Sequence, residues 1–454
     1  IVSFTEPKST GLLAFSVITN GRKLLSYEAS KSPDMMNCLH GIRVISTQWV
    51  VLGHTYVMYL VLPIRNFAYF LEFTSKYENM FILSALISVD TFFTMSGLLV
   101  SVNLLKQFEK TGGRINILML YIHRYLRLTP LLVVSILFSS TIMQYLGSGP
   151  LWPGIISLIR GQCERHWLST LLYVQNYANA KDMCFAHSWY LSVDTQLFLI
   201  SPFVMYLIYK FKSKAVFGLS VLVLGCIGCT ISTFLVENFQ GMDTIDGDKM
   251  AKTYFPTHIR FSPWLIGVFG GYILHIYRNR TVHISRMINL LGWIISLAVM
   301  ATVIFANYPL VQPTQNVSSL DHALYESLSR VAWAMALCYI IFACVHNYGG
   351  PVNWFLSHPL WQPLSRLSYA IYLVHFPVVI VFQAAMKTSP QFSEAIAFHT
   401  FIGNFVMTVF ISIFASLAFE SPIITIEKLI FSNRSQSARR EDRAPLEEPQ
   451  IENE

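Results

Sequence analysis

Charged residues are scarce in this sequence. Asp, Glu, Lys and Arg make up 13% of its 454 residues, whereas a soluble globular chain is typically about a quarter charged. This shortage excludes an ordinary cytosolic enzyme. The chain is instead 54% hydrophobic and 14% aromatic, with a mean hydropathy of +0.48, and such a composition also excludes a disordered chain. We expect an all-α integral membrane protein whose core is one bundle of spanning helices.

The signature motifs of several protein classes are also missing. The formal charge is +7, but no basic stripe alternates with aromatic residues, so no nucleic-acid partner is expected. The sequence contains no HExxH, Walker loop or GxSxG motif. Cys226 and Cys229 have CxxC spacing, but they lie in an apolar run without a second pair. We interpret them as packing residues, and no metal site is predicted.

About ten segments are apolar over the roughly 20 residues that cross a bilayer. They are Ile42–Leu62, Asn79–Leu105, Leu128–Leu146, Ser188–Tyr209, Ala215–Val236, Arg260–Tyr277, Met287–Ala306, Leu328–Val345, Leu367–Met386 and Thr400–Glu420. Residues 1–36 mix apolar and basic side chains and are predicted to be a cytosolic or interfacial segment. Residues 432–454 are predicted to be a disordered cytosolic tail, which leaves 37–431 as the membrane domain.

Basic residues concentrate on one side of these segments. About 21 of the 32 Lys and Arg fall in the terminal segments and alternate loops, and about eight fall in the opposite loops. Because positively charged loops stay in the cytosol, both termini are predicted to be cytosolic, in the plasma membrane or an endomembrane. A glycosylation sequon at Asn316 and the pair Cys163 and Cys184 fall on the other side, where a glycan and a disulfide are permitted. The alternative for the cysteines is two free thiols.

Ionisable residues inside spans are costly and are therefore functional candidates. Arg43 and His54 are eleven residues apart, which places them on one helix face roughly 16 Å apart. That pair suits a substrate entering from the cytosol; the alternative is a snorkelling Arg and a His bonded to a neighbouring helix. Asp90, in the second span, could fix the tautomer of a nearby His or merely cap the span. Ser96 belongs to a small-residue pair that permits close helix packing.

Further candidates lie in the third, fourth and ninth spans. Arg124 and Arg127 are three residues apart, so they are neighbours on a helix surface that faces the cytosol. They could grip phosphate groups, or they could bind lipid headgroups as ordinary positive-inside residues. The remaining candidates are polar or aromatic residues for which packing and interface anchoring are the alternative: Trp189, Tyr190, Asp194, Tyr369 and His375.

In order along the chain, these motifs resemble those of the acyltransferase-3 family, and more closely its animal nose-resistant-to-fluoxetine-type branch. Six motifs of this sequence carry the resemblance. They are residues 40–54, which include the Arg43-to-His54 spacing, residues 89–97, the RxxR motif of Arg124 and Arg127, and residues 188–194, 368–375 and 420–422. The resemblance covers about residues 37–431. Asp194 stands where many members have Glu. Animal members also carry a Cys-rich domain and one more span upstream, so the chain is expected to be truncated at its N-terminus.

The resemblance implies an enzyme that moves an acyl group from cytosolic acyl-CoA to the hydroxyl of an acceptor reached from the far side of the membrane. It implies that His54 is the base or a transient acyl carrier, that Arg43 is its partner, and that Arg124 and Arg127 clamp the donor's phosphates. We expect Asp90 or Asp194 to orient His54. The acceptor is expected to be a lipid or a small hydroxylated molecule, among membrane lipids. The alternative is a lipid or xenobiotic transporter that kept the fold without catalysis.

Overall fold

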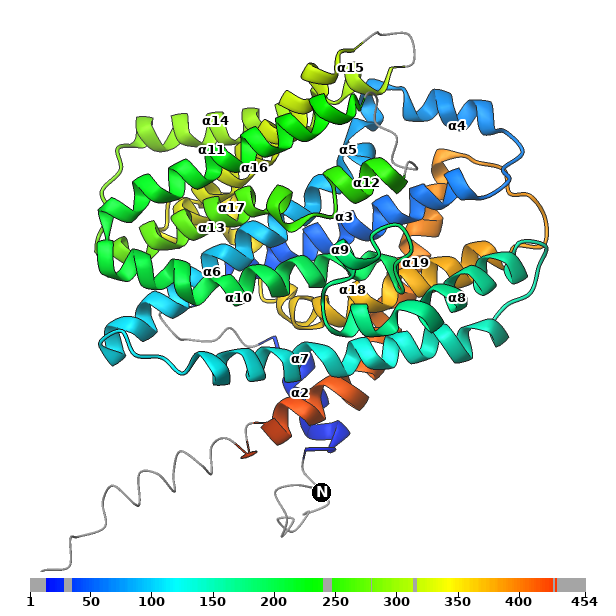
Figure 1. The fold of residues 1–454 in the computed structure, drawn as a ribbon, viewed down its shortest axis with the longest axis horizontal. Helices are drawn as coiled ribbons and strands as arrows, with labels where there is room; N and C mark the ends of the chain where they lie inside the picture. Colours follow the sequence, from blue (N-terminus) through cyan, green and yellow to red (C-terminus); the bar gives the residue numbers. More distant parts are fainter. Residues whose placement is uncertain are drawn as a thin grey trace, which may run out of the picture.

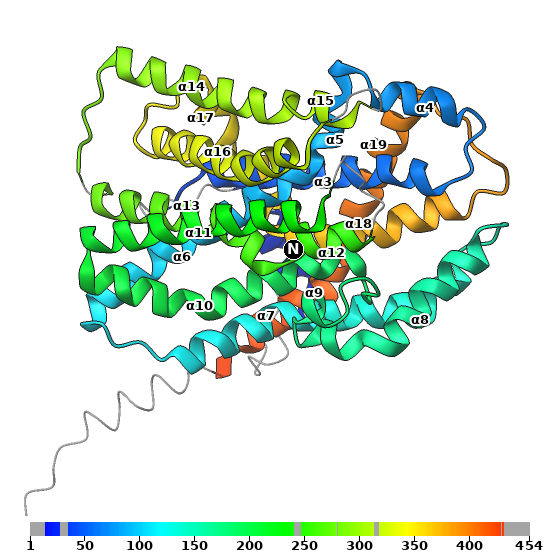
Figure 2. The ribbon, with the colours of Figure 1, turned by 45° about the horizontal axis from the view of Figure 1, so that its top comes forward.

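The computed structural model describes residues 14–27, 35–239, 247–278, 280–312, 317–427 and 429–430. Within these ranges every regular element is helical, and ten helices are long and apolar enough to cross a membrane. They lie alongside one another as a bundle (Figure 1, Figure 2). This architecture confirms the predicted all-α polytopic bundle. The sequon at Asn316 and the predicted tail 432–454 lie outside the described residues.

The ten long helices each overlap one predicted segment. They are α3 (Cys38–Val61), α6 (Ser88–Thr111), α7 (Ile117–Leu137), α10 (Trp189–Phe211), α11 (Ser213–Glu237), α13 (Thr257–Tyr277), α14 (Arg286–Phe305), α16 (Ser319–Val345), α18 (Trp361–Ala384) and α19 (Glu394–Ala415). Two of them begin about three turns earlier than their apolar runs. Asn116 caps α7 by accepting a hydrogen bond from the backbone of Met119, and Ser318 forms a capping box with Asp321 at the start of α16. Caps set where a helix begins, whereas apolar side chains mark only its membrane part.

Shorter helices lie before or between the predicted spans, except α5 (Met80–Leu83), which falls within the predicted span Asn79–Leu105. They are α2 (Val17–Leu25), α4 (Phe67–Thr74), α5 (Met80–Leu83), α8 (Trp152–Leu171), α9 (Gln175–Ala178), α12 (Gly247–Thr253), α15 (Tyr308–Val311) and α17 (Gly350–Leu356), with short 3-10 and π-helical turns between some elements. α8 is long but too polar to span. α4 and α8 lie at the same end of the bundle, at the right of Figure 1. Cys163 of α8 is joined to Cys184 by a disulfide.

The N-terminal helix α2 is tied to the bundle at its C-terminal end. The guanidinium of Arg366 on α18 donates hydrogen bonds to the carbonyls of Lys23 and Leu24, at 2.8 and 3.2 Å. These carbonyls belong to the last turn of α2, where a helix leaves its carbonyls unpaired and attracts positive charge. At the other end, the hydroxyl of Ser16 accepts from the backbone of Thr19. The segment 1–36 therefore contributes a docked helix to the domain.

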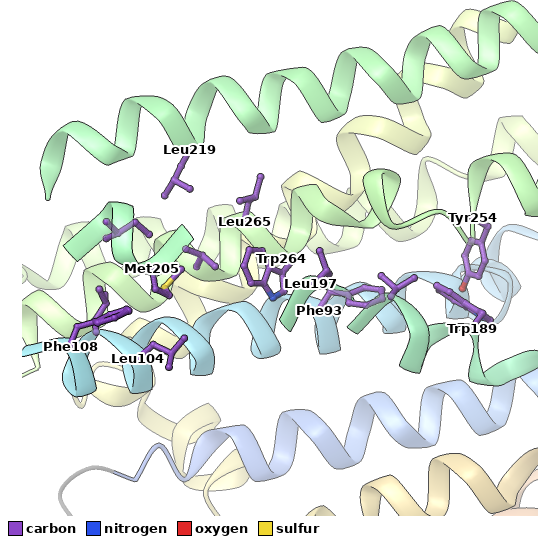
Figure 3. Packing of buried hydrophobic residues seen from close by; sticks show 14 of the residues in the cluster. Phe93, Leu104, Phe108, Trp189, Leu197, Met205, Leu219, Tyr254, Trp264 and Leu265 are labelled. Atoms are coloured by element: carbon purple, nitrogen blue, oxygen red, sulfur yellow. The ribbon is translucent and has the colours of Figure 1, made fainter. Parts of the chain in front are cut away.

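The most extensive contact between two described helices is the one between α6 and α13. A Cβ added at Gly97 would lie 2.2 Å from the carbonyl oxygen of Trp264, and one added at Gly267 would lie 2.1 Å from that of Thr94. The two backbones touch at these positions, which only glycine permits. Around this contact the largest apolar cluster gathers side chains from α6, α10, α11 and α13, among them Phe93, Trp189 and Trp264 (Figure 3).

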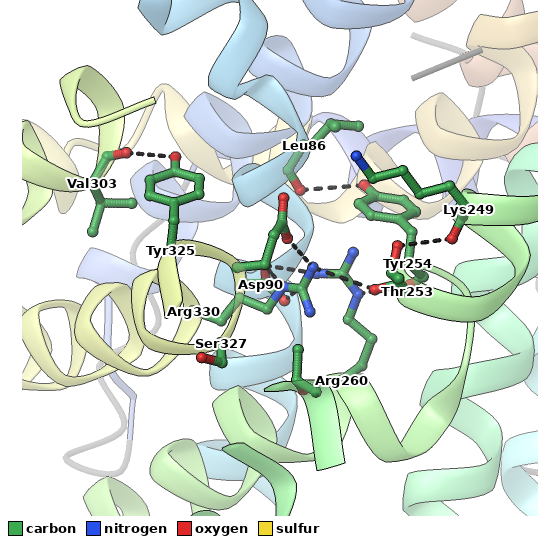
Figure 4. A network of polar contacts seen from close by, with 12 residues as sticks. Leu86, Asp90, Lys249, Thr253, Tyr254, Arg260, Val303, Tyr325, Ser327 and Arg330 are labelled. Carbon is green, nitrogen blue, oxygen red and sulfur yellow. Dashed lines mark hydrogen bonds and ion pairs between the residues drawn. The ribbon is translucent and has the colours of Figure 1, made fainter. Parts of the chain in front are cut away.

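A buried charge network joins the same helices. Both carboxylate oxygens of Asp90 on α6 accept hydrogen bonds of 2.9 Å from Arg260 on α13. Arg330 of α16 lies 4.0 Å from Asp90 (Figure 4). Arg330 also pairs with Glu326. Asp90 and Arg260 are 0% and 1% exposed, and buried charges are stable only when paired. Asp90, in the first turn of α6, is therefore a link between helices.

Candidate functional site

Two cavities enter the bundle and share a wall. The first has a volume of about 820 Å³ and lies between α2, α3, α6, α7, α10, α18 and the π-helical turn Ser416–Glu420. The second has a volume of about 280 Å³ and lies between α3, α4, α5, the segment 250–255 and α18. Four residues line both cavities: Val50, Val89, Tyr190 and Tyr372. Ligands bound in the two cavities would therefore approach each other at this wall.

Three histidines gather at the shared wall. His54 of α3 and His187, in the turn before α10, line the second cavity, whereas His375 of α18 lines the first. Nε2 of His375 lies 3.0 Å from Nδ1 of His54. The rings of His187 and His375 are 5.2 Å apart, and Phe376 lies between 5 and 6 Å from His54 and His187. The sequence pointed to His54 and His375 separately; it assigned no role to His187.

The hydrogen bonds of His375 assign the tautomer of His54. Nδ1 of His375 lies 2.6 Å from the carbonyl oxygen of Tyr372, and because a carbonyl only accepts, Nδ1 carries the proton. In a neutral ring Nε2 of His375 then accepts, so Nδ1 of His54 must be the donor. Nε2 of His54 is left unprotonated. The arrangement leaves His54 with one basic nitrogen and fixes its ring orientation.

The second acidic candidate, Asp194, is engaged elsewhere. Its carboxylate accepts a hydrogen bond of 2.7 Å from the hydroxyl of Ser96 and forms an ion pair with Arg124. The guanidinium of Arg124 also lies over the ring of Phe198, 4.2 Å from its centre. These contacts tie α6, α7 and α10 together on the wall of the first cavity. His54 thus pairs with His375, whereas Asp194 pairs with Ser96 and Arg124.

Basic side chains dominate the first cavity. Its lining includes five Lys or Arg side chains and two carboxylates; the basic residues are Lys23, Arg43, Arg124, Arg127 and Arg366. Arg43 donates to the hydroxyl of Ser365 at 3.4 Å, and the ring of His40 lies 2.9 Å from the same hydroxyl. Arg127 has an exposed side chain. An excess of positive charge in a concave site raises the local concentration of polyanionic ligands.

The aromatic candidates hold the helices around the histidines. Trp189 is buried, with its ring 4.8 Å from that of Tyr254. Tyr190 lies 5.5 Å from Tyr372, ring to ring, in the shared wall. The hydroxyl of Tyr372 donates to the backbone carbonyl of His187, and that of Tyr369 donates to the carbonyl of Leu128. Tyr369 and Tyr372 thus connect α18 to α7 and to the segment that carries His187.

A separate polar cluster surrounds the disulfide at the far end of α7. Arg165 of α8 donates to the carboxylate of Asp182 at 2.9 Å, and these hydrogen bonds hold the pKa of Asp182 below its ordinary value. Cys163 and Cys184 are buried beside it and do not line either cavity. Among the described residues no group of three or more His, Cys, Asp or Glu could hold a metal ion.

Comparison with known proteins places the chain in a family. Residues 36–420 match the model of the acyltransferase domain of the acyltransferase-3 family. The chain is similar to nose resistant to fluoxetine protein 6 of Caenorhabditis elegans, at 28% identity over 95% of this chain and 56% of that protein. It is also similar to regulator of hypoxia-inducible factor 1 of Caenorhabditis elegans, at 24% identity over 80% of this chain and 73% of that protein.

One bacterial relative has a name that states an enzymatic activity. O-acetyltransferase OatA of Staphylococcus aureus is 25% identical over 65% of this chain and 46% of that protein. The chain thus spans about half the length of nose resistant to fluoxetine protein 6 and of OatA. No solved structure matches it. Since the family model covers most of the sequence and ten helices can cross a membrane, the chain belongs to the acyltransferase-3 family of multi-pass membrane proteins.

Proposed function

We propose that this protein transfers an acyl group from acyl-CoA in the first cavity to the hydroxyl of an acceptor in the second. The observation that carries the proposal is the hydrogen bond of 3.0 Å between His54 and His375 in the wall that the cavities share. This hydrogen bond leaves Nε2 of His54 as a basic nitrogen at the shared wall, where an acyl donor in the first cavity would meet an acceptor in the second. The kinship with an O-acetyltransferase supports the same chemistry.

The first cavity suits a coenzyme A thioester. Lys23 and Arg127 lie among its basic lining residues, and Arg43 stands deeper, near His40 and Ser365. The phosphate groups of coenzyme A would bind these cations, so the cavity suits a ligand with several negative charges. The acyl thioester would then extend to the wall formed by Tyr190 and Tyr372. Arg124 shares its charge with Asp194, so we assign it to the cavity wall and Arg127 to the phosphates.

His54 acts as the general base in this proposal. The acceptor oxygen attacks the thioester carbonyl while Nε2 of His54 takes the hydroxyl proton. The new C–O bond forms, the C–S bond breaks, and the thiolate of coenzyme A leaves and takes the proton back from the imidazolium. His375 accepts the hydrogen bond from Nδ1 of His54 throughout, which stabilises the imidazolium. All atoms and electrons of this step are accounted for without a metal ion or a redox partner.

We assign the first cavity to the cytosolic side. Acyl-CoA is a charged cytosolic metabolite, and the loops at the α2 end carry most of the Lys and Arg of the chain. The disulfide between Cys163 and Cys184 follows α7 at the opposite end of the bundle, which suits an oxidising compartment. Both termini would then lie in the cytosol, and the acceptor would enter from the far side.

The test is release of coenzyme A by the purified protein. Labelled acyl-CoA is supplied with a lipid extract, and free thiol, labelled lipid and labelled protein are measured. We expect His54→Ala to abolish release and His399→Ala, at an exposed position of α19, to preserve it. Undiminished release by a well-folded His54→Ala protein overturns the proposal. Uptake of lipid or drug that survives this substitution, without any thiol release, identifies the transporter alternative.

A further inference from the structure

The walls of the second cavity are almost entirely apolar. Aliphatic and aromatic side chains from α3, α4, α5, the 3-10 turn Ser84–Ile87 and α18 form them, among them Leu60, Phe73, Ile82, Leu86 and Phe376. Apolar surface of this kind gains by excluding water and binding hydrocarbon. The first cavity differs, since basic side chains line it. The two halves of the site therefore select ligands of opposite chemistry.

Four polar side chains that line the second cavity are already bonded to the backbone. The hydroxyls of Thr74 and Ser88 donate to carbonyls 2.9 and 2.5 Å away. The amide of Asn79 donates to a carbonyl at 2.8 Å, and the hydroxyl of Tyr254 donates to one at 3.3 Å. A ligand with many hydroxyls would find few unengaged donors here. Such a ligand loses its hydrogen bonds to water without replacing them, which weakens binding.

His187, in the turn before α10, also lines this cavity. It is 5% exposed, and neither ring nitrogen makes a hydrogen bond of normal distance and angle to the described residues. Its ring is held between Phe185 and Phe376, with ring centres 4.3 and 5.1 Å away. The backbone of Tyr372 and Leu373 interacts with this ring, but not at normal hydrogen-bond geometry. The buried imidazole therefore still has hydrogen-bonding capacity for a ligand in the cavity. Its neighbour on the same cavity is His54.

We infer that the second cavity binds a largely apolar alcohol and that His187 holds the hydroxyl of this acceptor beside His54. The inference rests on the proposed function and names its substrate class. One hydroxyl satisfies both rings: its oxygen accepts from an N–H of His187, and its O–H donates to Nε2 of His54, the basic nitrogen. The rest of the acceptor occupies the apolar walls. A lipid-like alcohol meets this pattern and a sugar does not.

The first experiment compares acceptors with the full chain in lipid nanodiscs. Acetyl-CoA is the donor, and release of coenzyme A is measured with farnesol, dodecanol, glycerol and N-acetylglucosamine in turn. We expect kcat/KM for the apolar alcohols to exceed that for the polar ones by about a hundredfold or more. An apolar pocket rejects one added hydroxyl by about a hundredfold, and the polar acceptors carry several hydroxyls and little apolar surface to bury. Equal or greater transfer to the polar acceptors overturns the inference while leaving the proposed function standing.

Binding is tested separately from turnover. A farnesol analogue bearing a diazirine is photolysed with the protein, and the labelled peptides are identified. Label is expected in the segments that line the second cavity, with competition by farnesol and not by N-acetylglucosamine. Leu86→Trp, which fills the cavity, should reduce the label, whereas Leu222→Trp on the exposed face of α11 should not. Label in the cavity without any thiol release contradicts the proposed function alone, and absence of label contradicts this inference.

The role of His187 has its own readout. His187→Phe keeps a ring between Phe185 and Phe376 but removes the hydrogen bond, so we expect the KM for farnesol to rise by about tenfold, the effect of roughly one hydrogen bond. The KM for acyl-CoA and the melting temperature should stay unchanged. His187→Gln, which restores a donor, should recover part of the affinity. An equal rise in both KM values, or a fall in melting temperature with no change in either KM, assigns His187 a structural role instead.

Discussion

His375 lies directly behind His54, with 3.0 Å between Nε2 of one ring and Nδ1 of the other. The two residues come from α18 and α3, and a backbone carbonyl of α18 completes the chain behind His375. A carboxylate usually occupies this place behind a catalytic imidazole. Here a neutral ring does so, which fixes the tautomer of His54 without placing a second charge inside the bundle.

The first prediction concerns this neutral partner. His375→Phe removes the acceptor for Nδ1–H of His54, so the ring of His54 would lose its fixed tautomer and the imidazolium its support. We expect kcat for acyl transfer to fall by about a hundredfold or more, the contribution of a well-placed general base. The KM for acyl-CoA should change little, since the basic residues that bind it are untouched. His399→Phe is the control, and an unchanged kcat with a raised KM would contradict this assignment.

The second prediction separates the two arginines of the RxxR motif. Arg127→Ala should raise the KM for acyl-CoA by about tenfold or more, as expected for loss of a charged hydrogen bond, and leave the melting temperature unchanged. Arg124→Ala should lower the melting temperature, because Asp194 would lose its ion-pair partner on α7. Adding Asp194→Asn to Arg124→Ala should recover part of that loss. Identical effects of the two single substitutions on KM and stability would refute the division of roles.

The third prediction concerns the buried network of Asp90. Asp90→Asn leaves Arg260 and Arg330 with one carboxylate between them, so we expect unfolding to become easier by about 3–5 kcal/mol. The fall in melting temperature measures this loss. Glu109→Gln, at an exposed carboxylate that pairs with His275, should have little effect. Activity per folded molecule should be retained; full stability combined with lost activity would instead return Asp90 to a catalytic role.

Apolar runs predicted the bundle well because membrane helices must be apolar over a fixed length. The same signal could not place the first turns of α7 and α16, since Asn116 and Ser318 set those starts through hydrogen bonds. It also missed α8, a helix too polar to span. Local sequence thus predicted which segments cross, while caps and surface helices depended on contacts that hydropathy does not describe.

For the candidate site, too, the sequence predicted individual residues but not the contacts between them. Arg43, His54 and His375 stood out because each is an ionisable group in an apolar run. Their neighbours could not be predicted, because helical spacing fixes a face and not the helix that the face contacts: His54 and His375 are 321 residues apart. The sequence did contain a signal that could have predicted the pairing of Asp90 with buried arginines. Arg260 and Arg330 also lie in apolar runs, and two buried cations require a buried anion.

The last prediction tests which end of the bundle faces the cytosol. Asn316 and Asn433 both head sequons, and the proposed orientation places only Asn316, which precedes α16, on the far side with the disulfide. A glycan forms only where the sequon leaves the cytosol. Expressed in animal cells, the protein should therefore shift in mobility on treatment with a glycosidase, Asn316→Gln should abolish that shift, and Asn433→Gln should preserve it. The opposite pattern reverses the orientation and places the basic cavity, with its acyl-CoA, outside the cytosol.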